Sequence, residues 1–131
     1  MKFPQTAIKK FNDSTCLFMC YLYCIGIEPD KLSSWMRYYA DALDKGVLSE
    51  EGYVLDGEKL LYLLTGKKYT IEKAAIDSIK DLKGPYPVQY VCGDYGHFVV
   101  VENGEIVFNP LEYSNCVTNG RPASARILKL K

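Results

Sequence analysis

The chain has 131 residues, 48% of them apolar, which is the size of one domain with enough apolar side chains to build a core. Its 16 Lys and Arg residues balance 16 Asp and Glu residues, and neither sign gathers in a long block. This balance argues against a protein that binds a nucleic-acid backbone or an anionic membrane surface. We therefore expect no nucleic-acid partner and no membrane partner.

The N-terminal residues lack the apolar run that a signal peptide needs. The longest apolar stretch, residues 16–27, is too short to cross a bilayer. Five cysteines cannot all pair within one chain, and an odd number fits a reducing compartment. We expect a soluble, cytoplasmic protein, although export by a phage or by a secretion system stays open.

Two helices are predicted in the first third of the chain. Residues 12–15, Asn-Asp-Ser-Thr, can cap a helix and precede an apolar run, which predicts a helix from Cys16 to Ile25 that ends at Gly26 and is buried on nearly all sides. A second helix is predicted from Pro29 or Asp30 to Lys45, closed by Gly46. The apolar residues that recur at helical spacing, and that should form its buried face, are Leu32, Trp35, Met36, Tyr39 and Leu43.

Shorter elements are predicted in the middle of the chain. After a loop, Asp56 is expected to cap a helix over residues 57–64, which ends at Thr65-Gly66. Residues 68–72 alternate in polarity like a short strand, and residues 75–82 are predicted to form another short helix.

The last third is rich in residues that favour strands. Asn103-Gly104 is a strong signal for a two-residue hairpin turn. The predicted strands cover residues 87–92, 97–102, 105–109 and 125–130. Helices followed by an antiparallel sheet predict a single α+β domain over residues 1–131.

Cys16, His97 and Asn109 stand in the chain order of a thiol-dependent acyl-transfer site. A cysteine attacks as a thiolate, and either a helix N-terminus or a neighbouring imidazolium lowers the pKa of a thiol. Cys16, at the predicted start of a helix, has the first of these. His97 is the only histidine and begins a predicted strand, so it would supply the second if the sheet packs against that helix.

The predicted hairpin is a geometric reason to pair His97 with Asn109. If the strands on either side of the turn pair with each other, residues whose numbers sum to about 207 face one another. His97 then lies opposite residue 110, and Asn109 is its neighbour at the same end. A side-chain amide in this place can hold one ring nitrogen and aim the other at a thiol.

Each of these residues also has an ordinary structural interpretation. A single histidine near a strand start is usually structural, cysteines in an apolar helix are usually core residues, and Asn-Pro commonly ends a strand. Cys16, Cys20 and Cys24 are spaced about 6 Å apart along a helix, so they cannot close around one ion. There is no C-x2-C pair either, so we expect no metal and no cofactor, and we assign Cys20 and Cys24 to the core.

Four segments of the chain resemble the papain-like cysteine peptidases, most closely the compact bacterial C39-like group. They are Ser14–Met19, Ile79–Val88, Gly96–Val101 and Val107–Pro110. In that group a short helix ending in glycine leads to a Pro-Val strand, then to a His-Phe-Val-Val-Val strand, then to a strand ending in Asp-Pro or Asn-Pro. The resemblance spans most of the chain and is weakest in the middle.

The resemblance implies a papain-like α+β fold, in which N-terminal helices with a central buried helix pack on a C-terminal antiparallel β-sheet. It also implies a cysteine-dependent hydrolase that cleaves a peptide or isopeptide bond through a thioester. In this mechanism Cys16 attacks the carbonyl, His97 protonates the leaving amine and later activates water, and Asn109 orients His97.

The chain departs from the family at two positions close to the nucleophile. The family usually has glycine directly after the cysteine and glutamine six residues before it, where this chain has Leu17 and Lys10. The family's glutamine helps to form the oxyanion hole. Lys10 and Asn12 are the candidates for this role here, because an ammonium or amide donor also stabilises an oxyanion. The candidates for the wall of the cleft are Trp35, Tyr38, Tyr39, Asp94 and Tyr95.

Two alternative functions stay open beside the hydrolase. A catalytically silent papain-like domain would bind a peptide or a partner protein through the same cleft, and the departures at Lys10 and Leu17 are the reason to keep it. A phage or bacterial cell-wall amidase would use a similar cysteine and histidine pair. Under each interpretation the partner is a peptide or a protein, and the oligomeric state is left undetermined.

Overall fold

The computed structural model describes residues 15–27, 32–110 and 116–131. These residues form four helices and a five-stranded antiparallel sheet, which confirms the predicted α+β class. The helices are α1 (Cys16–Cys24), α2 (Leu32–Asp44), α3 (Gly57–Thr65) and α4 (Cys116–Asn119), and the strands are β1 (Tyr69–Ala75), β2 (Tyr86–Cys92), β3 (Tyr95–Glu102), β4 (Glu105–Phe108) and β5 (Arg121–Leu130). Within the described ranges, no helix is both long and apolar enough to span a bilayer.

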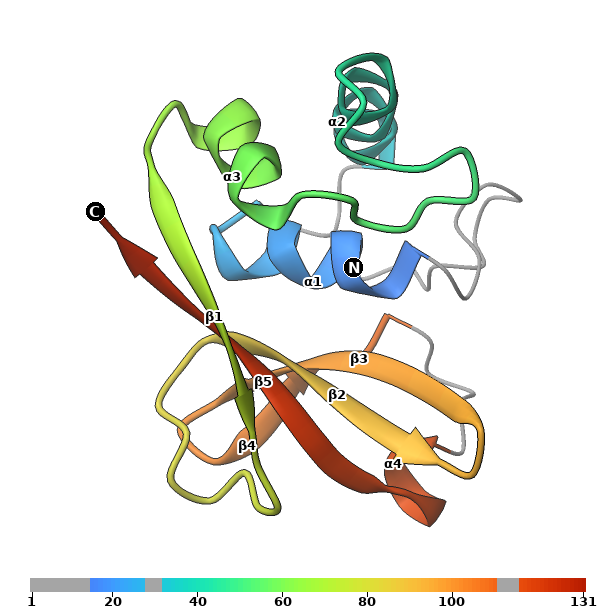
Figure 1. Cartoon of the computed structure of the whole chain (residues 1–131), viewed down its shortest axis with the longest axis vertical. Coiled ribbons are helices and arrows are strands. Elements are labelled where there is room, and N and C mark those ends of the chain that lie inside the picture. Colours follow the sequence, from blue (N-terminus) through green and yellow to red (C-terminus); the bar gives the residue numbers. More distant parts are fainter. Residues whose placement is uncertain (1–14, 28–31, 111–115) are drawn as a thin grey trace.

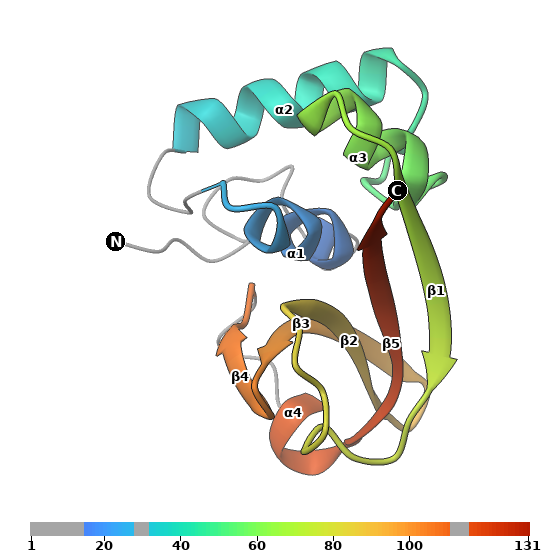
Figure 2. The ribbon, with the colours of Figure 1, turned by 90° about the vertical axis from the view of Figure 1, so that its left-hand side faces the viewer.

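Helix α1 lies between an outer layer formed by α2 and α3 and the sheet on its other side (Figures 1 and 2). The strand order is β1-β5-β2-β3-β4, so the last strand of the chain lies in the interior of the sheet. Helix α1 packs across β2 and β3, and α3 packs on β1. The predicted arrangement of a central helix against a C-terminal antiparallel sheet is therefore present.

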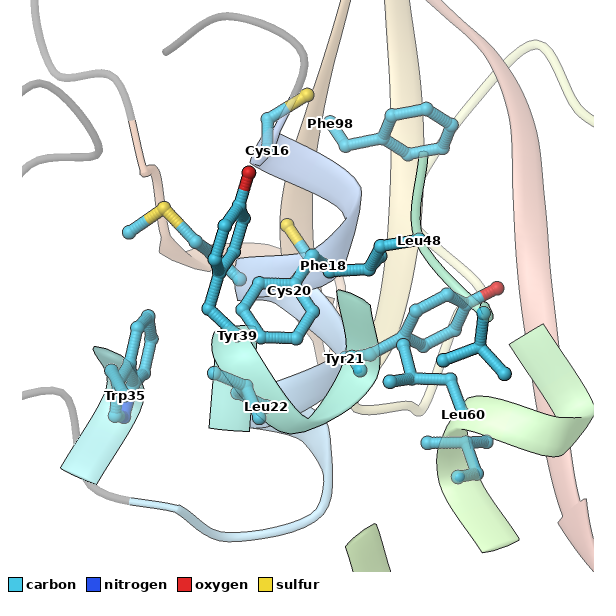
Figure 3. Close-up of a cluster of buried hydrophobic side chains, with 14 of the residues drawn as sticks. Cys16, Phe18, Cys20, Tyr21, Leu22, Trp35, Tyr39, Leu48, Leu60 and Phe98 are labelled. Atoms are coloured by element: carbon cyan, nitrogen blue, oxygen red, sulfur yellow. The ribbon is translucent and has the colours of Figure 1, made fainter. Parts of the chain in front are cut away.

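The composition of α1 requires this central position. Its nine residues include no charged side chain, and Phe18, Met19, Cys20 and Leu22 are fully buried. Burying one such apolar side chain contributes about 1.5–3 kcal/mol, so a helix that is apolar on every side is stable only when it is covered on every side. Figure 3 shows Phe18, Cys20 and Leu22 in one cluster with labelled side chains from α2, α3 and β3.

The sheet separates two apolar clusters because side chains alternate between the faces of a strand. On β3, Phe98 and Val100 belong to the cluster around α1, whereas Val99 and Val101 belong to a second cluster on the other face. The second cluster also includes Cys116 of α4, a short helix that the sequence analysis did not anticipate.

Helix α2 buries a narrower stripe than predicted. Trp35 and Tyr39 are buried as expected, and Leu43 packs against the core, but Met36 is 47% exposed, so its assignment to the buried face is wrong. The outer position of α2 explains the difference, because such a helix is covered along one side only. The predicted start at Pro29 or Asp30 and the side chain of Leu32 lie outside the described residues.

The helix predicted over residues 75–82 is wrong. Strand β1 continues to Ala75, which pairs with Ser124, and the backbone N–H of Ile76 donates to the carbonyl of Ala123 at 3.0 Å. An isolated helix this short is marginal, and the hydrogen bonds of Ala75 and Ile76 to β5 take up its predicted first residues. The apolar residues after Ala75 that suggested a helix pack instead on the second cluster as irregular chain.

Helix α3 has the predicted cap at each end. The Asp56 carboxylate accepts a hydrogen bond from the Lys59 backbone N–H at 3.1 Å, and Gly66 ends the helix with a left-handed φ of 72°. One backbone donor of the first turn is thereby satisfied, and the glycine supplies a conformation that other residues adopt at a cost.

Replacing the cap of α3 should weaken the fold by a predictable amount. We expect Asp56→Ala to lower the free energy of unfolding by about 1 kcal/mol, because the Lys59 N–H loses its acceptor. Asp56→Asn keeps an acceptor oxygen and should recover most of the loss. Urea denaturation of the three proteins measures the effect, and equal losses for the two variants would contradict a capping role.

Candidate functional site

Cys16 is the first residue of α1, as predicted. The N-cap position is Thr15, which is fully buried and makes no side-chain capping bond; its hydroxyl instead contacts the Met19 sulfur at 3.9 Å. The Cys16 side chain therefore lies at the positive end of the helix dipole, where a negative charge is stabilised. Residues 12–14, the other predicted capping residues, lie outside the described residues.

A cavity of about 380 Å³ opens beside Cys16, between the helical layer and the sheet. Its lining residues come from α1, from the loop before α3 and from the β2–β3 hairpin: Cys16, Leu17, Tyr53, Val54, Gln89, Asp94, Tyr95, Gly96 and Phe98. Figure 3 shows the Cys16 sulfur pointing toward Phe98. Leu17, which stands where the family usually has glycine, contributes its side chain to this wall.

His97 and Asn109 are joined directly by a hydrogen bond. The distance from His97 Nε2 to Asn109 Oδ1 is 2.6 Å, and His97 is fully buried. An amide oxygen can only accept, so Nε2 carries the proton in this bond, and a neutral ring then has its lone pair on Nδ1. The predicted neighbourhood of His97 and Asn109 is confirmed.

The hairpin that joins them has the predicted turn and most of the predicted register. Asn103 and Gly104 both have positive φ, 53° and 77°, as a two-residue hairpin turn of this kind requires. Glu102 pairs with Glu105, and the residue numbers sum to 207 as expected. A bulge between Val100 and Val101 then shifts the ladder by one residue, so strand β4 ends at Phe108 and Asn109 follows it.

The imidazole lies behind the wall of the cavity. Gly96 and Phe98, on either side of His97, line the cavity beside Cys16. His97 itself pairs with Tyr90 across the β2–β3 ladder, so it shares the Tyr90 face of the sheet and not the Phe98 face. The structure thus brings His97 and Asn109 together, and it brings Cys16 to a cavity walled by the same strand that carries His97.

The remaining candidates fall into three groups: residues that line the cavity, residues of the core, and residues outside the described part of the chain. Asp94 and Tyr95 line the cavity, as predicted. Trp35 and Tyr39 do not, because both are buried in the core, and Tyr38 packs against that core. Lys10 and Asn12, the candidates for the oxyanion hole, lie outside the described residues.

Tyr53 and Gln89 are among the residues of the cavity wall that were not predicted from the sequence. Tyr53 lies in a loop and carried no periodic signal. Gln89 did carry a signal that was overlooked, because it is a polar residue in the middle of an otherwise apolar strand. A polar side chain in such a place needs a hydrogen-bonding partner or a function.

Cys20, Cys24 and Cys116 are poor nucleophiles. Burial raises the pKa of Cys20 and Cys24, and burial followed by the nearby Cys92 thiol raises that of Cys116. These three thiols stay protonated at neutral pH, as the predicted core role of Cys20 and Cys24 requires. Among the described residues, no group of three or more His, Cys, Asp or Glu side chains could hold a metal ion.

Comparison of the chain with models of known families, with curated proteins and with solved structures finds no match.

The start of α1 is held in place by Gly52. This glycine has a φ of +97°, and a Cβ atom added to it would collide with the Thr15 methyl group and lie 3.3 Å from the Tyr39 hydroxyl. Thr15 directly precedes Cys16, so a side chain at position 52 would displace the residue next to the thiol.

We expect Gly52→Ala to lower the free energy of unfolding by roughly 2–4 kcal/mol, because backbone strain and the collision with Thr15 add. Gly46→Ala is the matched control: Gly46 has a similar φ of +73° but open space around it, so only the strain of about 1–2 kcal/mol applies. Urea denaturation separates the two. Equal losses would show that the contact with Thr15 is unimportant.

Proposed function

We propose that the chain is a papain-like cysteine hydrolase, most similar to the C39-like group, that cleaves a peptide or isopeptide bond through a thioester on Cys16. The observation that carries the proposal is the 2.6 Å hydrogen bond from His97 Nε2 to Asn109 Oδ1. This bond fixes the ring tautomer in which Nδ1 is the basic nitrogen, which is what a general base for a thiol requires.

The position of Cys16 supports its role as the nucleophile. It begins α1, whose dipole favours the thiolate, and it lines a cavity that can receive a substrate. Cys20 and Cys24, further along the same helix, have neither feature, and burial raises their pKa values.

The proposed reaction has two steps. Nδ1 of His97 takes the proton of the Cys16 thiol, the sulfur bonds to the substrate carbonyl carbon, and the carbon–nitrogen bond breaks as the leaving amine receives that proton. His97 then takes a proton from water, whose oxygen attacks the thioester, and the carbon–sulfur bond breaks to release the acid and the thiol. The backbone N–H of Cys16 and a donor from the preceding loop, where Lys10 and Asn12 are the candidates, would stabilise the oxyanion.

A second candidate function is a silent papain-like domain that binds a peptide without cleaving it. Two observations favour it: His97 is fully buried behind the cavity wall, and the Leu17 side chain occupies part of that wall. The same cavity would then serve for recognition alone. A cell-wall amidase would have the same thiol chemistry, and assays with peptide, isopeptide and muropeptide substrates distinguish it from a peptidase.

Selective alkylation tests the nucleophile. We expect iodoacetamide at mildly acidic pH to label Cys16 ahead of the other four cysteines, because Cys16 lies at a helix N-terminus, lines the cavity and is the thiol that His97 deprotonates in the proposed reaction. Peptide mapping by mass spectrometry identifies the labelled site. His97→Ala should abolish the preference, whereas Cys92→Ser, which removes a half-buried thiol outside the cavity, should leave it intact.

The hydrolase and the silent domain predict different labelling patterns. Equal labelling of all five cysteines, or no labelling of Cys16, would rule out the hydrolase. It would leave a binding cleft as the remaining function of the cavity.

Removing the partner of His97 should affect reactivity more than folding. We expect Asn109→Ala to reduce the rate of Cys16 alkylation about tenfold or more, because the imidazole loses the bond that orients it. The unfolding free energy should fall by about 1–3 kcal/mol, since a buried donor loses its acceptor. Asn109→Asp keeps an acceptor oxygen and should preserve most of the reactivity. A loss of folding with the labelling rate of the remaining folded protein unchanged would make Asn109 a turn residue only.

A further inference from the structure

A chain of hydrogen bonds runs through the α1-facing side of the sheet toward the cavity beside Cys16. Nη1 of Arg126 donates to the Ser124 hydroxyl at 3.1 Å, and that hydroxyl donates to Gln89 Oε1 at 3.4 Å. Ser124 and Gln89 are directly paired across the β2–β5 ladder, so their side chains leave the sheet on the same face. Gln89 is the last member of this series of hydrogen bonds and lines the cavity.

The number of donors and acceptors on each group determines which group donates in each of these hydrogen bonds. A guanidinium has donors only, so the Ser124 oxygen must accept from Arg126. The one hydroxyl proton of Ser124 is then left to donate to Gln89, which requires the amide oxygen of Gln89 to face Ser124. The amide nitrogen, Nε2, therefore faces the other way.

Nε2 of Gln89 is presented at the cavity wall. A Cβ atom added to Gly96 would lie 2.8 Å from this nitrogen, so the missing side chain of Gly96 makes room for it. Both residues line the cavity together with Cys16. Within the part of the chain that the structure describes, Nε2 donates a hydrogen bond to no group.

Arg126 is itself held by packing. Its guanidinium carbon lies 5.1 Å from the centre of the Phe98 ring, and the side chain is half buried. Such a cation over an aromatic face is attracted by the ring, so Arg126 has a defined position from which to orient Ser124. Phe98 contributes both to this contact and to the cavity wall.

We propose that Gln89 is a substrate-binding residue whose Nε2 donates a hydrogen bond to a carbonyl oxygen of the peptide bound beside Cys16. Ser124 and Arg126 are positioning residues that hold the amide in its donating orientation. A neutral donor on a partly buried wall matches a neutral peptide carbonyl, because neither partner brings an unpaired charge into the site. This inference rests on the proposed function of Cys16.

Two alkylating probes test Gln89 separately from Cys16. Iodoacetamide reports the reactivity of the thiol alone, and an acetylated diglycyl chloromethyl ketone adds peptide carbonyls without side chains. We expect Gln89→Ala to reduce the second-order rate constant for the peptide probe about 5- to 10-fold and to change that for iodoacetamide less than about twofold. Gln89→Glu keeps the shape and still accepts from Ser124 but cannot donate, so it should slow the peptide probe at least as much; its negative charge also disfavours the thiolate in the same cavity and should slow iodoacetamide as well.

Ser124→Ala tests the positioning role. It should reduce the rate for the peptide probe by a smaller factor, about two- to fourfold, because the donor remains but its orientation is no longer held. Ser78→Ala, which removes a serine hydroxyl outside the cavity wall, is the matched control and should change neither rate. Urea denaturation confirms that each variant is folded.

The outcomes separate the two proposals. If the wild-type protein labels at Cys16 with iodoacetamide but the Gln89 variants react with both probes as the wild type does, the role of Gln89 is wrong and that of Cys16 stands. The role of Gln89 is also wrong, and that of Cys16 stands, if the wild-type protein reacts with iodoacetamide but not with the peptide probe. If Cys16 shows no preference for iodoacetamide in the wild type, the proposed function fails and this inference fails with it.

Discussion

The fold depends on the burial of one helix that has no polar face. Because α1 is apolar on all sides, it must be covered by α2 and α3 on one side and by the sheet on the other. The two coverings come from different parts of the chain and meet along α1. At its N-terminus they leave the cavity that holds Cys16. The burial of α1, which stabilises the core, therefore also places the Cys16 thiol between the helical layer and the sheet.

The residues of the candidate site are brought together over very different separations along the sequence. His97 and Asn109 are twelve residues apart and are joined by one hairpin, so turn chemistry and strand register bring them together. The bulge at Val100 modifies this register without separating them. Cys16, in contrast, reaches the hairpin only because α1 packs across β2 and β3. The hydrogen-bonded pair is thus a local feature, and its relation to the thiol is a property of the whole fold.

The errors of the sequence analysis have one physical origin. Met36 was assigned to the core from its spacing, but spacing does not say how many sides of a helix are covered, and α2 is an outer helix. Residues 75–82 were predicted to be a helix, but Ala75 and Ile76 form hydrogen bonds with β5, a segment about 50 residues further on. In both cases the prediction used only the local sequence pattern, and the neighbouring elements of the fold determined the actual structure.

By itself the sequence determined the α+β class, the central helix beginning at Cys16, the capped helix α3 and the hairpin that joins His97 to Asn109. Each of these follows from side-chain periodicity, caps or turn residues, which act over a few residues. The tertiary structure alone decided the strand order and, through it, the row of Arg126, Ser124 and Gln89 that leads to the cavity. Such contacts depend on which strands become neighbours, and packing of the whole sheet against α1 determines that choice.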